Sequence, residues 1–133
     1  MIKKSFLLLF IPFCLTNCYE PQRDCARFKN GAFSFTTVIN EEEKTTTFIR
    51  EGDLEIDFFE GRRDSASIRW INDCEYILKN LSPKNRAEEK SIHMKILSTS
   101  DNSYTFEYGI VGESRKSTGT AVKITAEEAI PKN

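Results

Sequence analysis

The sequence has few of the residues and motifs that carry enzymatic chemistry. Its 133 residues include a single histidine, His93, without a second histidine or a patterned acid that would make it a metal site or a catalytic base. No serine lies in a Gly-x-Ser-x-Gly nucleophile elbow, and no glycine-rich phosphate loop is present. We therefore expect no catalytic residue, no metal and no cofactor. A hydrolase is therefore the least favoured of three functional hypotheses, after a binding module and an inhibitor.

Clusters of basic residues are also missing. The 19 Lys and Arg residues are scattered through expected turns and are outnumbered by 20 Asp and Glu residues. Binding to a nucleic acid duplex depends on clustered Lys and Arg that neutralise its phosphates. We therefore expect no nucleic acid partner.

The apolar run near the N-terminus is too short to span a bilayer. Lys3 and Lys4 precede an apolar stretch over residues 6–13, whereas a transmembrane helix needs about 20 such residues. This arrangement is typical of a secretory signal, which we place at residues 1–17.

The residues that end this signal indicate a lipid anchor. Residues 15–18, Leu-Thr-Asn-Cys, resemble the bacterial lipobox, and nothing near them fits the Ala-x-Ala-like site of the general signal peptidase. We expect Cys18 to become the N-terminus and to carry diacylglycerol and an amide-linked acyl chain, which together anchor a protein stably. A plain secreted protein is the alternative. Tyr19, rather than Asp, follows the cysteine, and by analogy with inner-membrane retention this favours the outer membrane.

Two of the four cysteines remain for a disulfide. Cys14 leaves with the signal and Cys18 takes the lipid, so Cys25 and Cys74 form an even pair in an oxidising compartment. A bridge between them closes a loop of about 50 residues and contributes roughly 4 kcal/mol in the chain-entropy model. Two unpaired buried thiols are the alternative.

The rest of the chain alternates between apolar and polar residues with a period of two. Turn residues divide residues 31–125 into eight short runs, and no strong amphipathic helix interrupts them. A meander of this kind hides its edges most simply by closing. We predict an all-β, antiparallel, lipocalin-like barrel, with a two-sheet sandwich as the alternative. Residues 18–30 are the expected tether. Residues 126–133 form a tail, where Thr125 and Glu128 have capping-box spacing.

Residues 67–80 form the expected central hairpin, with the only tryptophan, Trp70. A three-residue turn over residues 71–73 pairs Trp70 with Cys74 and keeps the inward positions apolar or nearly so. The same logic at residues 51–53 pairs Phe48 with Ile56.

This second register places an acidic row on the outer face of the sheet. Residues two apart on a strand are separated by nearly 7 Å, so their carboxylates diverge rather than converge on a calcium ion, the minor alternative. We interpret the row as a solvated face, made of Asp53, Glu55 and Asp57.

The inward positions could line a pocket for an apolar ligand or simply fill the barrel. With this alternation no Lys, Arg, Asp or Glu lies deep inside, whereas a carrier of a charged lipid needs a polar group to fix the head group. His93, between inward Ile92 and Met94, faces outward. The candidate lining residues are Phe33, Phe35, Phe58, Trp70, Tyr76, Met94, Tyr104, Phe106 and Tyr108.

Residues 64–66, Asp-Ser-Ala, resemble the three-residue O-glycosylation signal of some bacterial envelopes. Ser65 is therefore a candidate for modification.

Several stretches resemble a family of small bacterial envelope lipoproteins, over roughly residues 25–124. They are Trp70-Ile71-Asn72-Asp73-Cys74-Glu75-Tyr76, Asn85, Ile92-His93-Met94-Lys95-Ile96-Leu97 and Tyr104-Thr105-Phe106-Glu107-Tyr108. The resemblance implies a lipocalin-like fold without an assigned activity. Some members carry the name "DNA topoisomerase IV", which the present residues do not support. An exported chain of residues 18–133 has no room for a breakage-reunion core, and it lacks an ATP-binding motif.

These observations lead to a functional expectation. We expect a lipid-anchored, non-enzymatic envelope protein whose barrel binds a small apolar ligand or another envelope protein. The alternative is an inhibitor-type lipoprotein that acts on a lysozyme or a protease through the loop at residues 81–90.

Overall fold

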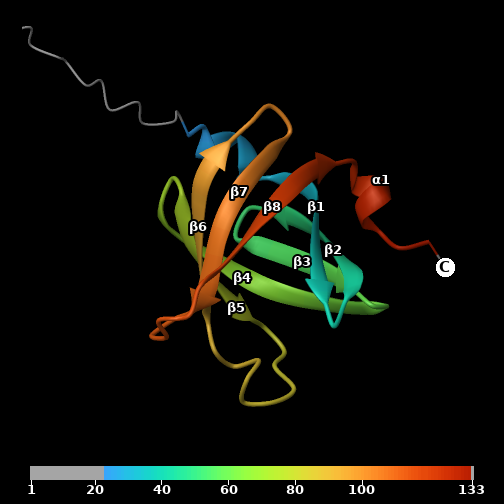
Figure 1. Cartoon of the computed structure of the whole chain (residues 1–133), viewed down its shortest axis with the longest axis vertical. Helices are drawn as coiled ribbons and strands as arrows, with labels where there is room; N and C mark the ends of the chain where they lie inside the picture. The colour runs from blue at the N-terminus through green and yellow to red at the C-terminus, as the bar shows by residue number, and fades with distance from the viewer. Residues whose placement is uncertain (1–22, 133) are drawn as a thin grey trace, which may run out of the picture.

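The computed structural model describes residues 23–132, which form a closed barrel of eight antiparallel strands (Figure 1). The predicted barrel is confirmed, and the sandwich alternative is wrong. The expected signal and Cys18 lie outside the described residues. The strands are β1 (Gly31–Ile39), β2 (Glu42–Glu51), β3 (Leu54–Phe59), β4 (Arg62–Asn72), β5 (Glu75–Asn80), β6 (Ile92–Thr99), β7 (Ser103–Ile110) and β8 (Ser117–Ile124).

Each strand pairs with its neighbours in the chain, and β8 closes the barrel on β1. The connections therefore alternate between two ends. One end carries the β2–β3, β4–β5 and β6–β7 turns together with a 3₁₀ helix, η1 (Cys25–Phe28), which covers it, and we call it the closed end. The open end carries the other turns and the one long connection, residues 81–91, which hangs below the barrel in Figure 1.

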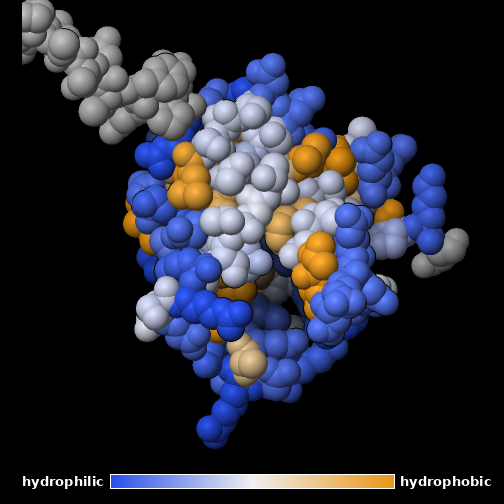
Figure 2. Space-filling model, in the orientation of Figure 1, coloured by the Kyte–Doolittle hydropathy of each residue, from blue (hydrophilic) through white to orange (hydrophobic). Residues whose placement is uncertain are grey.

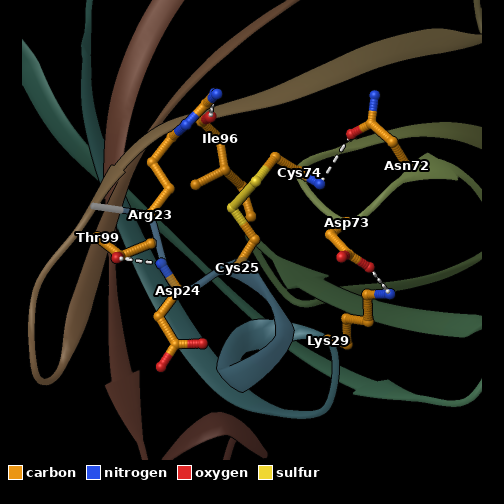
Figure 3. The surroundings of a disulfide bond; sticks show 9 residues. All are labelled: Arg23, Asp24, Cys25, Lys29, Asn72, Asp73, Cys74, Ile96 and Thr99. Atoms are coloured by element: carbon orange, nitrogen blue, oxygen red, sulfur yellow. Dashed lines mark hydrogen bonds and ion pairs between the residues drawn. A yellow bond between two sulfur atoms is a disulfide. The ribbon is translucent and has the colours of Figure 1, made fainter. Parts of the chain in front are cut away.

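A disulfide fastens the N-terminal segment to the closed end (Figure 3). Cys25 is bonded to Cys74, so the expected bridge is present. Phe28 is 1% exposed and packs into the barrel, while Lys29 forms an ion pair with Asp73. Residues 23–30, which lie in the expected tether, are thus packed against the barrel because the bridge and the buried phenylalanine hold them there.

The register of the β4–β5 hairpin differs from the prediction. Trp70 pairs with Tyr76, not with Cys74, and the strand has a bulge between Trp70 and Asn72. The backbone N–H of Cys74 donates to Oδ1 of Asn72 (2.9 Å), which supports the tight turn. The bulge inserts one residue, so both aromatic side chains face inward while Cys74 turns toward Cys25.

The β2–β3 register was also predicted wrongly, with larger consequences. The turn has two residues rather than three, because Gly52 adopts a φ of +60° that other residues rarely take. Phe48 therefore pairs with Asp57 instead of Ile56, and Arg50 pairs with Glu55. A shift of one residue exchanges the faces of β3, so its carboxylates point into the barrel.

A short helix, α1 (Ala126–Ala129), follows the barrel. The capping box expected from Thr125 and Glu128 is confirmed, since each side chain accepts a hydrogen bond from the backbone of the other. The hydroxyl of Thr47 donates to the Ala129 carbonyl (2.6 Å), which holds α1 on the outer side of β1 and β2. Over residues 23–132, neither helix is long and apolar enough to cross a membrane.

Candidate functional site

A buried arginine lies inside the barrel near its closed end. Arg50 is 2% exposed, and its Nε is 2.6 Å from Oε2 of Glu55, which is 4% exposed. These two residues face each other directly across the β2–β3 hairpin. Because burying an unpaired charge is very costly, each residue makes the burial of the other tolerable.

The guanidinium is also hydrogen-bonded on its other sides. Nη1 donates to the carbonyl of Phe28 (3.1 Å), and Nη2 donates to the hydroxyls of Tyr104 (2.8 Å) and Tyr76. Burial raises the pKa of both tyrosines, although Arg50 acts in the opposite direction, so their hydroxyls stay neutral. The network joins η1, β2, β3, β5 and β7, and it seals the barrel toward the closed end.

Above this seal a pocket of about 170 Å³ opens toward the other end of the barrel. Its floor is formed by Arg50 and Glu55, and its entrance includes Ile92, which is 37% exposed. The walls are mostly apolar and aromatic: Phe35, Phe48, Leu78, Met94, Phe106 and Tyr108, with Thr46 and Asp57 as polar members. The ring of Phe35 packs directly against Gly119. A Cβ at position 119 would collide with this ring.

Asp57 is the acidic group on the pocket wall. It lies two residues after Glu55 on β3 and directly opposite Asp64 of β4. Burial, followed by the nearby negative charge of Glu55 and a hydrogen bond with it, raises the pKa of Asp57 to about 8, although Arg50 acts in the opposite direction. At neutral pH this carboxyl is therefore mostly protonated and can donate a hydrogen bond.

A groove of about 420 Å³ continues from the pocket at the open end. The two share Asp57, Leu78 and Ile92, and the groove runs on between β4 and the loop of residues 81–91. Arg62 holds this loop through an ion pair with Glu88 (3.1 Å). In Figure 2 the surface is hollowed toward this end, with hydrophobic side chains beside the hollow.

The predicted lining residues divide into three groups. Four of them line the pocket: Phe35, Met94, Phe106 and Tyr108. Four others, Phe33, Trp70, Tyr76 and Tyr104, pack together between the pocket and the closed end, where the Trp70 and Tyr76 rings are 4.5 Å apart. Phe58 pairs with Thr47 on the outer face, because the shorter β2–β3 turn reverses the faces of β3.

The prediction of a solvated acidic row was wrong. Glu55 and Asp57 face the interior, and only Asp53 is exposed, in the β2–β3 turn. The prediction that no charged residue lies deep inside was also wrong, because the same register brings Arg50 and Glu55 into the interior. Sequence reasoning missed these residues because it judged register by apolar pairing alone. Arg50 lies two positions before Gly52 and Glu55 two positions after Asp53, so a two-residue turn pairs these opposite charges, and this was the available signal.

The other candidate residues lie on the surface of the barrel. His93 contacts Oε2 of Glu75 across β5 and β6 (3.0 Å) on the outer face. Ser65 is half-buried at the edge of the open-end groove, beside Asp64. In the part of the chain that the structure describes, no three His, Cys, Asp or Glu side chains gather as a metal site. No protein-family model matches the chain, and no curated protein matches it.

Proposed function

We propose that this chain is a non-enzymatic binding module of the bacterial envelope, which takes a small, mainly apolar ligand into its barrel through the open end. The observation that carries the proposal is the apolar-walled pocket above the Arg50–Glu55 seal. Small-molecule sites are typically concave and apolar, with a few polar groups that orient the ligand. The pocket has this composition, since Asp57 and Thr46 are set among aromatic and aliphatic side chains.

The dimensions suit a small ligand. A cavity of about 150 Å³ lined by apolar side chains binds benzene, so the pocket has room for a ring or a short alkyl segment. A longer chain would continue into the groove of about 420 Å³ at the open end. The pocket and groove together lie within the range of about 300–1,000 Å³ of ligand sites.

A lipid anchor at Cys18 would also orient this site. Arg23 already lies at the closed end, where its Nη1 donates to the Ile96 carbonyl (3.2 Å). An extended chain spans at most about 3.6 Å per residue, so the five steps from Cys18 keep the closed end within about 18 Å of the membrane surface. This short tether favours an orientation in which the open end faces away from the anchoring membrane and is accessible to ligand.

The anchor is tested by replacing the cysteine. Cys18→Ser should release the protein from the membrane fraction, while Cys14→Ser, in the expected signal, should leave it there. Unchanged membrane fractionation of the Cys18→Ser variant would refute lipidation at this position.

The binding site is tested by titrating the barrel with octan-1-ol and following backbone amide resonances by NMR. We expect shifts in β6 and β7 beside the pocket. The variant Ile92→Trp should narrow the entrance and weaken binding by at least about tenfold, which is about 1.4 kcal/mol. Ile71→Trp is the matched control, because Ile71 is equally apolar and 51% exposed, but at the closed end. The proposal fails if octanol at millimolar concentration shifts no pocket resonance, or if the two variants weaken binding equally.

An inhibitor acting through residues 81–90 is the second candidate, favoured by the way this loop is held. Glu88 accepts a hydrogen bond from the backbone of Lys84 (2.7 Å) and pairs with Arg62, and Lys90 pairs with Glu113. A preorganised loop loses less entropy on binding than a flexible one. Inhibition predicts a stable complex with a lysozyme or a protease that disappears when residues 83–90 are replaced by a Gly/Ser linker. Absence of a complex with the intact loop excludes this candidate.

A further inference from the structure

We propose that the ligand of the barrel pocket carries a basic nitrogen, whose protonated form lies against Asp57 while its apolar part lies among the aromatic walls. This inference rests on the proposed function, because it names the chemical class of the ligand for the same pocket. Three features of the pocket carry it: the carboxyls in its wall, the occupied arginine in its floor, and the apolar surface around both.

The first feature is an excess of carboxyls over cations. Arg50 forms its ion pair with Glu55, which leaves Asp57 as a second carboxyl in the lining of the same pocket. Within residues 23–132, no Lys or Arg forms an ion pair with Asp57. The neighbouring acid on β4, Asp64, is itself paired with Arg62 (3.2 Å). A cationic ligand would supply the ion-pair partner that Asp57 does not have among residues 23–132.

The second feature is that Arg50 is not available to an anion. Its donors are directed to Glu55, to the Phe28 carbonyl and to two tyrosine hydroxyls, and it is 2% exposed. At the open end Lys90 lines the groove but is already paired with Glu113, and Arg50 is the one cation among the residues that line the pocket, so an entering carboxylate or phosphate would find no unpaired cation there. Burying an anion without a cationic partner is costly at any pH, and once Asp57 is ionised its charge also repels the anion, so the pocket disfavours anionic amphiphiles.

The third feature is the apolar wall beside the carboxyl. Phe48 pairs with Asp57 across β2 and β3, and Phe106 and Met94 complete the wall around the same pocket. Aromatic faces attract cations and also accept hydrocarbon. An ammonium group at Asp57 would therefore be flanked by carboxyl oxygens and aromatic rings, with its alkyl or aryl part in contact with the remaining walls.

Binding of an ammonium group requires Asp57 to ionise. The proton leaves the carboxyl for solvent, and the carboxylate then accepts hydrogen bonds from the ammonium. The charged groups that face Asp57 are Arg50 on β2, Glu55 on β3 and Asp64 on β4. Because the pKa of Asp57 is about 8 in the empty barrel, binding should strengthen as the pH rises from 6 to 9. An alkylamine stays protonated over this range, since it titrates near a lysine side chain at about 10.4.

The test compares three probes with the same chain: octylamine, octan-1-ol and octanoate. We expect octylamine to bind at least about tenfold more tightly at pH 9 than at pH 6. Octan-1-ol should not gain affinity over this range, and octanoate should bind most weakly at both values. Pocket amide resonances confirm that each probe binds inside the barrel.

Two variants locate the effect. Asp57→Asn removes the ionisable group at nearly constant shape, so it should abolish the pH dependence and weaken octylamine about tenfold at pH 9, with little change for octan-1-ol. Asp53→Asn, in the exposed β2–β3 turn of the same hairpin, is the control and should change neither. The near-ultraviolet signal of Trp70 confirms folding of each variant.

The outcomes separate the two proposals. If octan-1-ol binds in the pocket as tightly as octylamine at pH 9, or if octanoate binds best, the inference of a basic ligand is wrong and the binding module stands. If octylamine gains no affinity with pH in the wild-type barrel, the role of Asp57 is wrong. If none of the three probes shifts a pocket resonance, the binding module itself is refuted.

Discussion

Removing the buried arginine should destabilise the barrel far more than removing a partly exposed lysine. In the variant Arg50→Met, Glu55 remains in the interior with a side chain that is 5% exposed and without a cation. Breaking a buried ion pair on one side costs about 3–5 kcal/mol, and the Phe28 carbonyl and the tyrosine hydroxyls lose their donors as well. The total expected loss of about 4–6 kcal/mol is a large part of the 5–15 kcal/mol that typically stabilises a domain.

Urea unfolding followed by the fluorescence of Trp70 measures this loss, because the indole packs against Tyr76 (4.5 Å between ring centroids) next to the network. Lys44→Met is the matched control. Lys44 pairs with Glu42 and Glu60, but its side chain is 31% exposed and solvent screens these pairs, so its removal should cost far less stability than the removal of Arg50.

A double variant distinguishes loss of the pair from loss of packing. Arg50→Met combined with Glu55→Leu removes both charges, so it should be more stable than Arg50→Met alone by about 2 kcal/mol or more. If Arg50→Met costs no more than Lys44→Met, or if the double variant is less stable than the single one, the central role assigned to the buried pair is refuted.

Three further predictions concern the disulfide, Asp57 and Gly119. Replacing Cys25 and Cys74 together by Ala should lower the free energy of unfolding by roughly 4 kcal/mol, because their separation is 49 residues; a loss below about 1 kcal/mol in urea would contradict this. The pKa of Asp57 is about 8 in the folded barrel against 3.8 ordinarily, so the folded state keeps a proton that the unfolded state releases. Stability should therefore fall as the pH rises from about 5 to 8, and Asp57→Asn should flatten the fall; a wild-type barrel equally stable at both values would oppose the assignment. Gly119→Ala should cost about 1–3 kcal/mol and displace the ring of Phe35, visible as altered aromatic resonances, whereas unchanged resonances would exclude the close approach.

The architecture could be predicted because it depends on a repeated local signal. Alternation with a period of two and frequent turns indicated eight strands, and closure follows from the need to pair the edges. The capping box of Thr125 and Glu128 and the pair of Cys25 and Cys74 were likewise readable from spacing and number.

The candidate site was only partly predictable, since register depends on details that the alternation does not contain. Phe35, Met94, Phe106 and Tyr108 were placed on the correct face, because β1, β6 and β7 have unambiguous patterns. Phe58 was placed on the wrong one. Choosing the register by apolar pairing favoured Ile56 over Glu55 as the inward residue, and a shift of one residue inverted the strand.

The sequence by itself determined the class of fold, the pair of cysteines and the absence of recognisable catalytic motifs, because each depends on composition or short-range spacing. Only the tertiary structure decided that Arg50, Glu55 and Asp57 enter the barrel. Burial of these charges is favourable only when a cation, a carboxylate and two hydroxyls from separate strands meet in one place, and that meeting is a property of the closed barrel. The same closure produced the pocket above them.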